Sequence, residues 1–272
     1  MTDELVLDRQ GCLLHATVVD GPGTPVVVTS GAIGLRSVSL ATLSPLVGKR
    51  KLVLLELRGH GPSSCRHPGH YTWRGLTDDL LGWVDHLALE RFALVGTSVG
   101  SIVSLGAAVE RPGAVESVAV TNAVFLGDDA AVDPDQEVAL RALAAAFGAD
   151  EAPSPEAIAA ALETLTPGRE QLYLGALRAH ADVESIASYF RLTDRGPIPY
   201  TTGDLAALDL PVLVLGGRDA IHPAAVSRAL ADLVPGARLV EAGDVSDLDA
   251  ALLLQSALVE FLAADLGLPA RT

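Results

Sequence analysis

Short runs of consecutive apolar residues recur along the chain, and most are followed by longer segments in which apolar residues return every three or four positions. Glycine, proline or aspartate bounds most of the short runs, as is typical of strands buried on both faces. The runs cover residues 12–19, 25–29, 51–56, 92–97, 115–121, 211–215 and 237–241, and helices are expected at 36–47, 76–89 and 248–262. Strands that alternate with helices in this way predict an α/β fold with a mostly parallel, twisted sheet flanked by helices.

The residue pattern and composition change between residues 123 and 199. No strand-like run occurs there, and Ala, Leu, Glu and Asp are frequent. Ser154, Pro155 and Glu156 precede an apolar segment at 157–165, and this order is a helix-start signal. We expect a helical lid at 123–199, inserted into an α/β core that comprises 1–122 and 200–272. The alternative is that these helices are further peripheral helices of the core.

The composition fits one large α/β domain with an insertion. The chain has 272 residues and is 49% hydrophobic, which is enough apolar material for such a core. A net charge of −15 argues against nucleic acid and anionic membranes as partners. No apolar run has the length of a membrane span, and the acidic N-terminus lacks the layout of a signal peptide. We therefore expect a cytoplasmic protein without membrane association.

Cys12 and Cys65 lie 53 positions apart and form no CxxC motif, which favours free thiols in a reducing compartment over a disulfide. Cys65, His67 and His70 superficially resemble a metal-binding cluster. However, the cluster lacks a second half with zinc-ligand spacing, so we interpret it as a polar loop. We predict no metal and no cofactor.

The segment Gly96-Thr97-Ser98-Val99-Gly100 stands where the apolar run 92–97 gives way to a helix of small residues. In a strand-to-helix turn this sharp, the positions two residues before and after the serine approach neighbouring backbone too closely for a Cβ. The alternative is a chance match in a chain with 26 glycines. The flanking strand and helix favour a nucleophile elbow with Ser98 at its tip.

The ordered motifs resemble those of the α/β-hydrolase fold over nearly the whole chain. They are Ser30-Gly-Ala-Ile-Gly34, Arg58-Gly-His-Gly61, Gly96-Thr-Ser-Val-Gly100 and Pro211-Val-Leu-Val-Leu-Gly-Gly-Arg-Asp219. This resemblance implies that Ser98 attacks an acyl carbon. It also implies an oxyanion hole made by the backbone N–H of Val99 and that of Ala32 or Ile33. Asp219 matches the family's late-strand acid, and its alternative use is turn formation.

The histidine that the family normally carries after its final strand has no counterpart in this sequence. Gly243 is followed there by Asp244, and no histidine occurs after His222. A serine hydroxyl is a poor nucleophile without a base to take its proton. Removing the triad histidine costs a hydrolase roughly 10⁶ in turnover, or about 8 kcal/mol. We therefore expect the fold to be retained and ordinary ester hydrolysis to be lost.

His222 is the best substitute for the missing base, because it lies three residues beyond Asp219 on the same loop. A base this close in sequence to its orienting acid is expected not to reach the elbow easily. His60, in the Arg-Gly-His-Gly motif, is expected to have a structural hydrogen-bonding role. Three histidines have no obvious chemical neighbours: His15, His86 and His180.

If Asp219 and Asp244 converge below Ser98, both cannot ionise freely, and the pKa of one of them is raised. Such a pair could move a proton at an already acidic carbon, although it could not activate a serine. Our first hypothesis is therefore non-hydrolytic proton transfer, such as epimerisation of a peptide-derived natural-product intermediate. This atypical triad is similar in kind to that of bottromycin-type peptide aspartate epimerases, which share the hydrolase fold.

Two alternatives stay open. One is an esterase-like serine hydrolase in which His222 is a relocated base. The other is a non-catalytic protein that retains the pocket to bind a ligand. In each case the expected partner is a small molecule or a modified peptide, and the sequence does not indicate an oligomeric state.

Overall fold

The computed structural model of the chain describes residues 1–65, 70–147, 154–180, 196–243 and 247–264. One sheet forms its centre, with strands in the order β1-β2-β4-β3-β5-β6-β7-β8. The strands are Thr2–Arg9 (β1), Cys12–Val19 (β2), Val26–Thr29 (β3), Leu52–Glu56 (β4), Phe92–Thr97 (β5), Val115–Thr121 (β6), Val212–Leu215 (β7) and Arg238–Val240 (β8). The β1–β2 and β2–β4 pairs are antiparallel, and all the other neighbouring pairs are parallel. The predicted mostly parallel sheet is confirmed.

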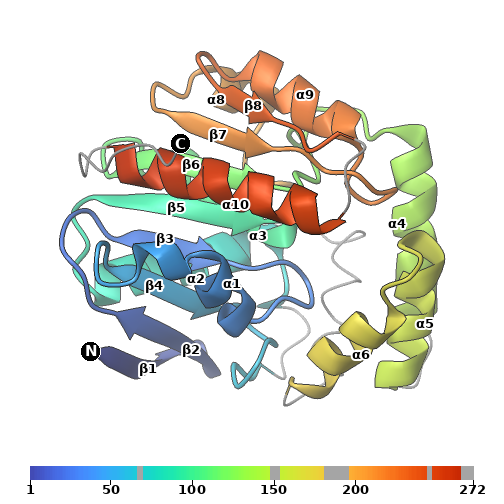
Figure 1. Cartoon of the computed structure of the whole chain (residues 1–272), viewed down its shortest axis with the longest axis horizontal. Coiled ribbons are helices and arrows are strands. Elements are labelled where there is room, and N and C mark those ends of the chain that lie inside the picture. The colour runs from blue at the N-terminus through green and yellow to red at the C-terminus, as the bar shows by residue number, and fades with distance from the viewer. Residues whose placement is uncertain (66–69, 148–153, 181–195, 244–246, 265–272) are drawn as a thin grey trace.

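Helices cover both faces of this sheet (Figure 1). They are Arg36–Thr42 (α1), the 3-10 turn Ser44–Leu46 (η1), Trp73–His86 (α2), Val99–Glu110 (α3), Pro134–Phe147 (α4), Pro155–Leu165 (α5), Glu170–Arg178 (α6), Thr202–Ala206 (α8), Ala224–Leu233 (α9) and Asp247–Ala263 (α10). Successive side chains of a strand point to opposite faces. In β3, Val27 belongs to the core cluster that includes residues of α2, α3 and α9, whereas Val26 and Val28 belong to the cluster that includes residues of η1 and α10. Burial on both faces explains why the strands are continuous apolar runs.

Two elements differ from the sequence-based prediction. Residues 36–47, expected as one helix, form α1 and the separate η1. Pro45 interrupts them because it has no backbone N–H with which to continue the helix. The edge strand β1 was not expected, because much of it is exposed and its apolar residues do not form a continuous run.

The helices α4, α5 and α6, called here the helical segment, lie beside the carboxyl ends of the parallel strands (Figure 1). They share a small hydrophobic cluster of their own, consisting of Leu143, Ile158, Ala159, Leu162 and Leu177. Ile33 and Ile221, from loops at the sheet edge, pack against this cluster. The expected start of α5 is confirmed, since the Ser154 hydroxyl accepts a hydrogen bond from the Ala157 N–H at 3.2 Å.

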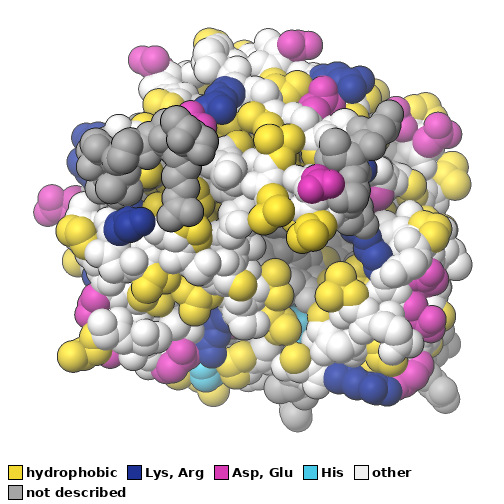
Figure 2. Space-filling view, in the orientation of Figure 1, with side chains coloured by type: hydrophobic (Ala, Val, Ile, Leu, Met, Phe, Trp, Pro, Cys, Tyr) yellow, Lys and Arg dark blue, Asp and Glu magenta, His cyan; other side chains and the backbone are white. Residues whose placement is uncertain are grey.

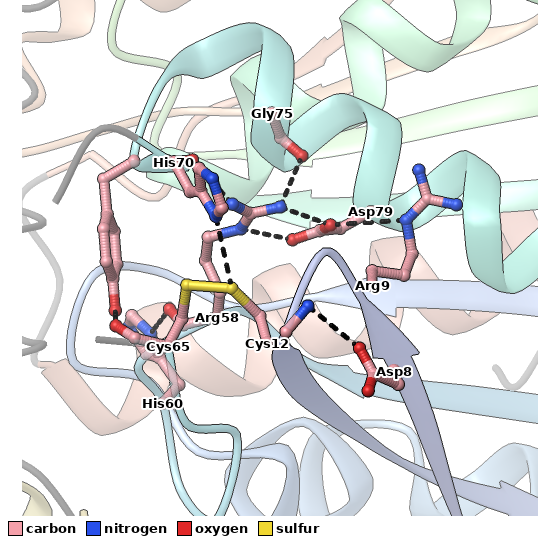
Figure 3. The surroundings of a disulfide bond; sticks show 11 residues. Asp8, Arg9, Cys12, Arg58, His60, Cys65, His70, Gly75 and Asp79 are labelled. Carbon is pink, nitrogen blue, oxygen red and sulfur yellow. Dashed lines mark hydrogen bonds and ion pairs between the residues drawn. A yellow bond between two sulfur atoms is a disulfide. The ribbon is translucent and has the colours of Figure 1, made fainter. Parts of the chain in front are cut away.

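The prediction of two free thiols is wrong, because Cys12 and Cys65 form a disulfide (Figure 3). The cause is a long-range contact that sequence spacing cannot reveal. Leu13 at the start of β2 pairs with Ser64 in an isolated β-bridge, and this bridge places the two neighbouring cysteines side by side. The His70 Nδ1 atom lies 3.7 Å from the Cys12 sulfur. The disulfide therefore fastens β2 to the loop that leads into α2.

A buried ion pair fastens the same loop from its other side (Figure 3). Arg58 donates from Nε and Nη2 to the two carboxylate oxygens of Asp79 on α2, at 2.6 and 2.5 Å. Its Nη1 donates to the His70 carbonyl at 2.7 Å. A two-point contact between guanidinium and carboxylate fixes direction as well as distance. The turn that begins at Arg58 is thus held against α2.

The surface carries charges of both signs around hydrophobic side chains that surround a hollow on the face shown in Figure 2. Among the residues that the structure describes, no helix combines the length and the apolar character needed to cross a bilayer.

Glu56, at the end of β4, is a buried carboxyl group with incomplete hydrogen bonding. Its side chain is 3% exposed. Its Oε1 accepts the Arg36 N–H at 3.3 Å, whereas Oε2 has no hydrogen-bond partner among the described residues. Burial raises the pKa of Glu56 to about 7, against the opposing effects of the Arg36 hydrogen bond and charge.

We expect Glu56 to make folding stability depend on pH between about 4.5 and 7. Because its pKa is higher in the folded state, the folded protein binds more protons in this window, and the free energy of unfolding falls as pH rises. The loss is at most about 3 kcal/mol, from 1.36 kcal/mol per pKa unit. Urea unfolding of Glu56→Gln should show a flatter profile and greater stability than the parent above pH 7. An unchanged slope would contradict this assignment.

Candidate active site

Ser98 occupies the sharp turn between β5 and α3, as the elbow motif predicts. Its backbone has φ 53° and ψ −118°, a conformation that non-glycine residues rarely adopt. The Ser98 N–H donates to the Thr121 carbonyl of β6 at 2.9 Å, which ties the turn to the neighbouring strand. Strain of this kind persists only where the surrounding structure enforces it.

Both flanking glycines are required by close backbone contacts. A Cβ at Gly96 would overlap the Gly100 carbonyl, and a Cβ at Gly100 would overlap the Thr29 carbonyl of β3. The Thr29 hydroxyl also lies 3.2 Å from the Gly100 carbonyl oxygen and 3.2 Å from the Ser104 hydroxyl. The elbow is therefore packed against β3 with no room for larger residues.

An imidazole stands next to the elbow hydroxyl, so the expectation that no base reaches Ser98 is wrong. The His222 Nε2 atom lies 2.8 Å from the Ser98 Oγ. On the other side of the ring, Nδ1 lies 2.9 and 3.1 Å from the two carboxylate oxygens of Asp219. Since a carboxylate only accepts hydrogen bonds, Nδ1 carries the proton and Nε2 is free to accept one from Ser98.

The loop after β7 explains how His222 can lie close to both partners. The Asp219 Oδ1 accepts the backbone N–H groups of Ile221 and His222 at 3.0 and 2.8 Å, which closes a tight turn around the carboxylate. The backbone of His222 lies so close to Gly217 that a Cβ at position 217 would overlap the His222 carbonyl. β7 and β5 are both neighbours of β6 and run parallel to it, so their carboxyl ends emerge at the same sheet edge. A separation of three residues along the chain therefore allows His222 to contact both Asp219 and Ser98.

The expected pair of competing carboxylates, Asp219 and Asp244, stays a prediction. Burial disfavours the ionised form of Asp219, but hydrogen bonds from His222 and the His222 charge outweigh burial and lower the Asp219 pKa. Asp244, the other proposed member of the pair, lies outside the described residues.

The three expected oxyanion donors lie around the elbow. Val99 is in the first turn of α3, where backbone N–H groups have no partner within the helix. Ala32 and Ile33 are the central residues of a turn closed by a 2.8 Å hydrogen bond from the Gly34 N–H to the Gly31 carbonyl. A Cβ at Gly31 would lie 3.1 Å from the Ser98 Cβ, so this turn abuts the serine.

A cavity of about 290 Å³ opens in front of Ser98, His222 and Asp219. Its walls are mostly apolar and come from the sheet loops, α2 and the helical segment. The apolar lining includes Trp73, Val124, Phe125, Leu140, Leu143, Leu162 and Ile221. Besides Ser98, His222 and Asp219, five polar side chains line it: Thr97, Asn122, Thr166, Arg169 and Tyr173.

Gln136 is a residue that the sequence reasoning missed. It is 1% exposed on α4, and its side-chain amide donates to the Ile221 carbonyl at 2.7 Å and the Val124 carbonyl at 2.9 Å. It therefore holds the loop that carries Asp219 and His222. A glutamine in a solvent-facing helical pattern gives no sequence signal for such a contact.

The remaining histidines that the structure describes lie away from the Ser98 hydroxyl. The expectation that His180 has no chemical neighbours is wrong, because its Nδ1 accepts the Gly61 N–H at 2.7 Å. His60 is fully buried, and its ring donates a hydrogen bond from Nε2 to the Ala32 carbonyl, in line with the expected structural role. His70 lies beside the disulfide, whereas His67 lies outside the described residues. The expected absence of a metal centre stays a prediction.

The comparisons with known proteins concern the chain as a whole and not the individual residues of the site. A sequence profile described as "Alpha/beta hydrolase family" matches residues 26–260. The crystal structure of the enol-lactonase from Burkholderia xenovorans LB400 superposes with a TM-score of 0.76 at 25% identity, covering 95% of this chain and 100% of that chain.

Sequence relatives match over shorter stretches. The chain is 32% identical over 102 residues to RutD, a candidate carbamate hydrolase of Klebsiella pneumoniae (strain 342), which covers 37% of this chain and 38% of that protein. It is 31% identical over 109 residues to the sn-1-specific diacylglycerol lipase ABHD11 of Danio rerio, covering 39% and 34%. The matched stretches thus span well under two thirds of these relatives.

We expect glycine-to-alanine substitutions at two helical positions to have opposite effects on stability, because only one of the two glycines lies in the crowded elbow. Gly100→Ala should destabilise the protein by about 1–3 kcal/mol or more, because the added methyl overlaps the β3 backbone. The matched control is Gly175→Ala on the exposed face of α6, where a Cβ meets nothing within 4 Å. Alanine there should stabilise by about 0.5–1 kcal/mol through helix propensity. Denaturant unfolding tests both, and equal effects would show that the elbow is not crowded.

Proposed function

Because the chain belongs to the alpha/beta hydrolase family, we propose that it is a serine hydrolase in which Ser98, His222 and Asp219 cleave an acyl bond. The observation that carries this proposal is the 2.8 Å contact between the Ser98 hydroxyl and the His222 imidazole. With a base in place, the hydroxyl can become a nucleophile.

In the proposed reaction, Ser98 attacks the acyl carbon while its proton moves to Nε2 of His222. The imidazolium that forms is stabilised by Asp219, whose lowered pKa keeps it ionised. His222 then returns the proton to the leaving group, and an acyl-enzyme ester remains on Ser98. A water molecule that gives its proton to the same imidazole releases the acid and restores the serine.

The negative oxygen of each tetrahedral intermediate would be bound by the Val99 N–H together with that of Ala32 or Ile33. Val99 adds the positive end of the α3 dipole, which favours an anion at this position. Backbone donors of this kind need no rearrangement during the reaction, and removing one in an enzyme costs about 10²–10³ in turnover.

The cavity favours a small, largely apolar acyl compound, such as a short ester or a lactone. Its volume of about 290 Å³ leaves room for a compact group, and its apolar lining offers few hydrogen bonds to a polar chain. The chain is similar to proteins named as an enol-lactonase, a candidate carbamate hydrolase and a lipase, and lactones, carbamates and lipid esters are all cleaved at a carbonyl carbon. In our proposal residues 123–199 act as the lid of this cavity.

The epimerase hypothesis depended on the absence of an imidazole at Ser98, and the contact with His222 removes that premise. We therefore do not propose proton transfer at a peptide stereocentre. The expected cytoplasmic location stays a prediction.

We expect a fluorophosphonate probe to label the protein at Ser98 and to inhibit hydrolysis of short p-nitrophenyl esters. Ser98→Ala should abolish labelling. His222→Ala and Asp219→Asn should lower kcat by about 10⁴ or more, since the base and its correct tautomer are lost. The readouts are the labelling rate, by mass spectrometry, and steady-state kinetics.

His86→Gln provides the control, because it removes an exposed imidazole at the end of α2. It should leave labelling unchanged. Asp244→Asn separates the two triad assignments, since the Asp244 assignment requires a loss as deep as that of Asp219→Asn. Intact protein that is never labelled, yet is stabilised by ligands recovered unchanged, would instead indicate a non-catalytic binding protein.

A further inference from the structure

The loop that carries the Ala32 and Ile33 amides is held by three hydrogen bonds, one to each of three successive carbonyls. The Gly31 carbonyl accepts from the Gly34 N–H at 2.8 Å within the loop. The Ala32 carbonyl lies 2.7 Å from the His60 Nε2. The Ile33 carbonyl lies 3.3 Å from the His180 Nε2. The last two contacts come from outside the loop.

The two imidazoles come from different parts of the chain. His60 belongs to the turn that Arg58 and Asp79 hold against α2, and it is fully buried. His180 follows α6 of the helical segment and is 6% exposed. Their rings meet edge to face, with centroids 5.3 Å apart at an angle of 86°. A hydrogen bond also joins His180 to the turn that contains His60, because the Gly61 N–H donates to the His180 Nδ1 at 2.7 Å.

The hydrogen-bond partners of His180 define its tautomer. His180 accepts at Nδ1, so its proton is on Nε2, which faces the Ile33 carbonyl. Both ring nitrogens of His60 face carbonyl oxygens, Nε2 that of Ala32 at 2.7 Å and Nδ1 that of Arg58 at 3.3 Å. We assign the proton of the neutral ring to Nε2, which makes the shorter contact. Burial, followed by the neighbouring His180, lowers the pKa of His60 to about 4, and burial also lowers the pKa of His180. Both rings are therefore neutral donors near neutral pH.

Binding a carbonyl also orients the N–H of the next residue. A peptide unit is planar and trans, so its C=O and N–H point in opposite directions. The Ala32 carbonyl is directed at the buried His60, which turns the Ile33 N–H away from that ring. The Gly31 carbonyl fixes the Ala32 N–H in the same way, through its bond with the Gly34 N–H. The Ile33 carbonyl, which faces His180, shares its peptide unit with that Gly34 N–H. His60 therefore acts on one candidate donor directly, and His180 acts on the donors through the hydrogen bond that closes the turn.

We propose that His60 and His180 are positioning residues for the oxyanion hole, and that His180 makes the geometry of the hole depend on the docked helical segment. This inference rests on the proposed hydrolase function and deepens it. Neither ring lines the cavity, so neither needs to touch the substrate. The contact between His180 and the Ile33 carbonyl couples α6 to catalysis, because the loop that contains Ile33 abuts Ser98.

The test compares His180→Phe, which keeps a ring against His60 but removes both hydrogen bonds, with His180→Gln, which keeps an amide donor and acceptor. With a short p-nitrophenyl ester, His180→Phe should lower kcat by about 10–100-fold, less than the loss of a whole donor. KM should change less than twofold, and the pH at which kcat/KM is half-maximal should stay unchanged, because His222 is untouched. His180→Gln should recover part of the lost kcat.

A transition-state analogue gives a second readout. A trifluoromethyl ketone forms a tetrahedral adduct with the serine, so its inhibition constant should rise in His180→Phe by the same factor as kcat/KM falls. His60→Gln should behave in the same direction if His180→Phe does not fold. The inference is overturned if a folded His180→Phe protein matches the parent in kcat and in inhibition, or if only KM changes. A parent protein that lacks both labelling and ester hydrolysis refutes the hydrolase proposal itself, and with it this inference.

Discussion

The turn that closes around the Asp219 carboxylate is the constraint on which the candidate site depends. One oxygen of that carboxylate accepts two backbone N–H groups and the His222 ring, so the acid shapes the loop and orients the base at once. Because Asp219 both closes the turn and contacts the imidazole, Asp219 and His222 can both face the cavity although they lie three residues apart. The strained elbow then presents Ser98 to the ring from the other side of β6.

Around this centre, the helical segment does more than enclose the cavity. Gln136 on α4 holds the loop of the acid and the base, and His180 after α6 holds the loop of the candidate oxyanion donors. Both side chains are buried, and both act on backbone carbonyls, which makes their contacts independent of the side chains on those loops. The helical segment therefore holds both the loop of Asp219 and His222 and the loop of the candidate oxyanion donors. Changes that loosen this segment should affect both loops.

Local patterns in the sequence predicted much of the fold. Continuous apolar runs indicated strands buried on both faces, and the spacing of Gly96 and Gly100 around Ser98 indicated the elbow, because close backbone contacts within a few residues determine both. The contact between His222 and Ser98 was only an alternative in that reasoning. The family pattern places a histidine after the last strand, whereas His222 lies in a tight turn whose shape depends on hydrogen bonds to Asp219. The disulfide between Cys12 and Cys65 was not predicted, since a bridge between distant segments creates that contact.

The tautomer of His222 tests the central claim most directly, and nitrogen-15 NMR of histidine-labelled protein measures it, with His222→Gln to assign the signals. The account predicts that, in the neutral ring, Nδ1 carries the proton and Nε2 does not. The Nδ1 proton should be strongly deshielded by the Asp219 carboxylate and should lose this deshielding in Asp219→Ala. A proton on Nε2, or an Nδ1 proton indifferent to Asp219, would contradict the assignment of His222 as the base that activates Ser98.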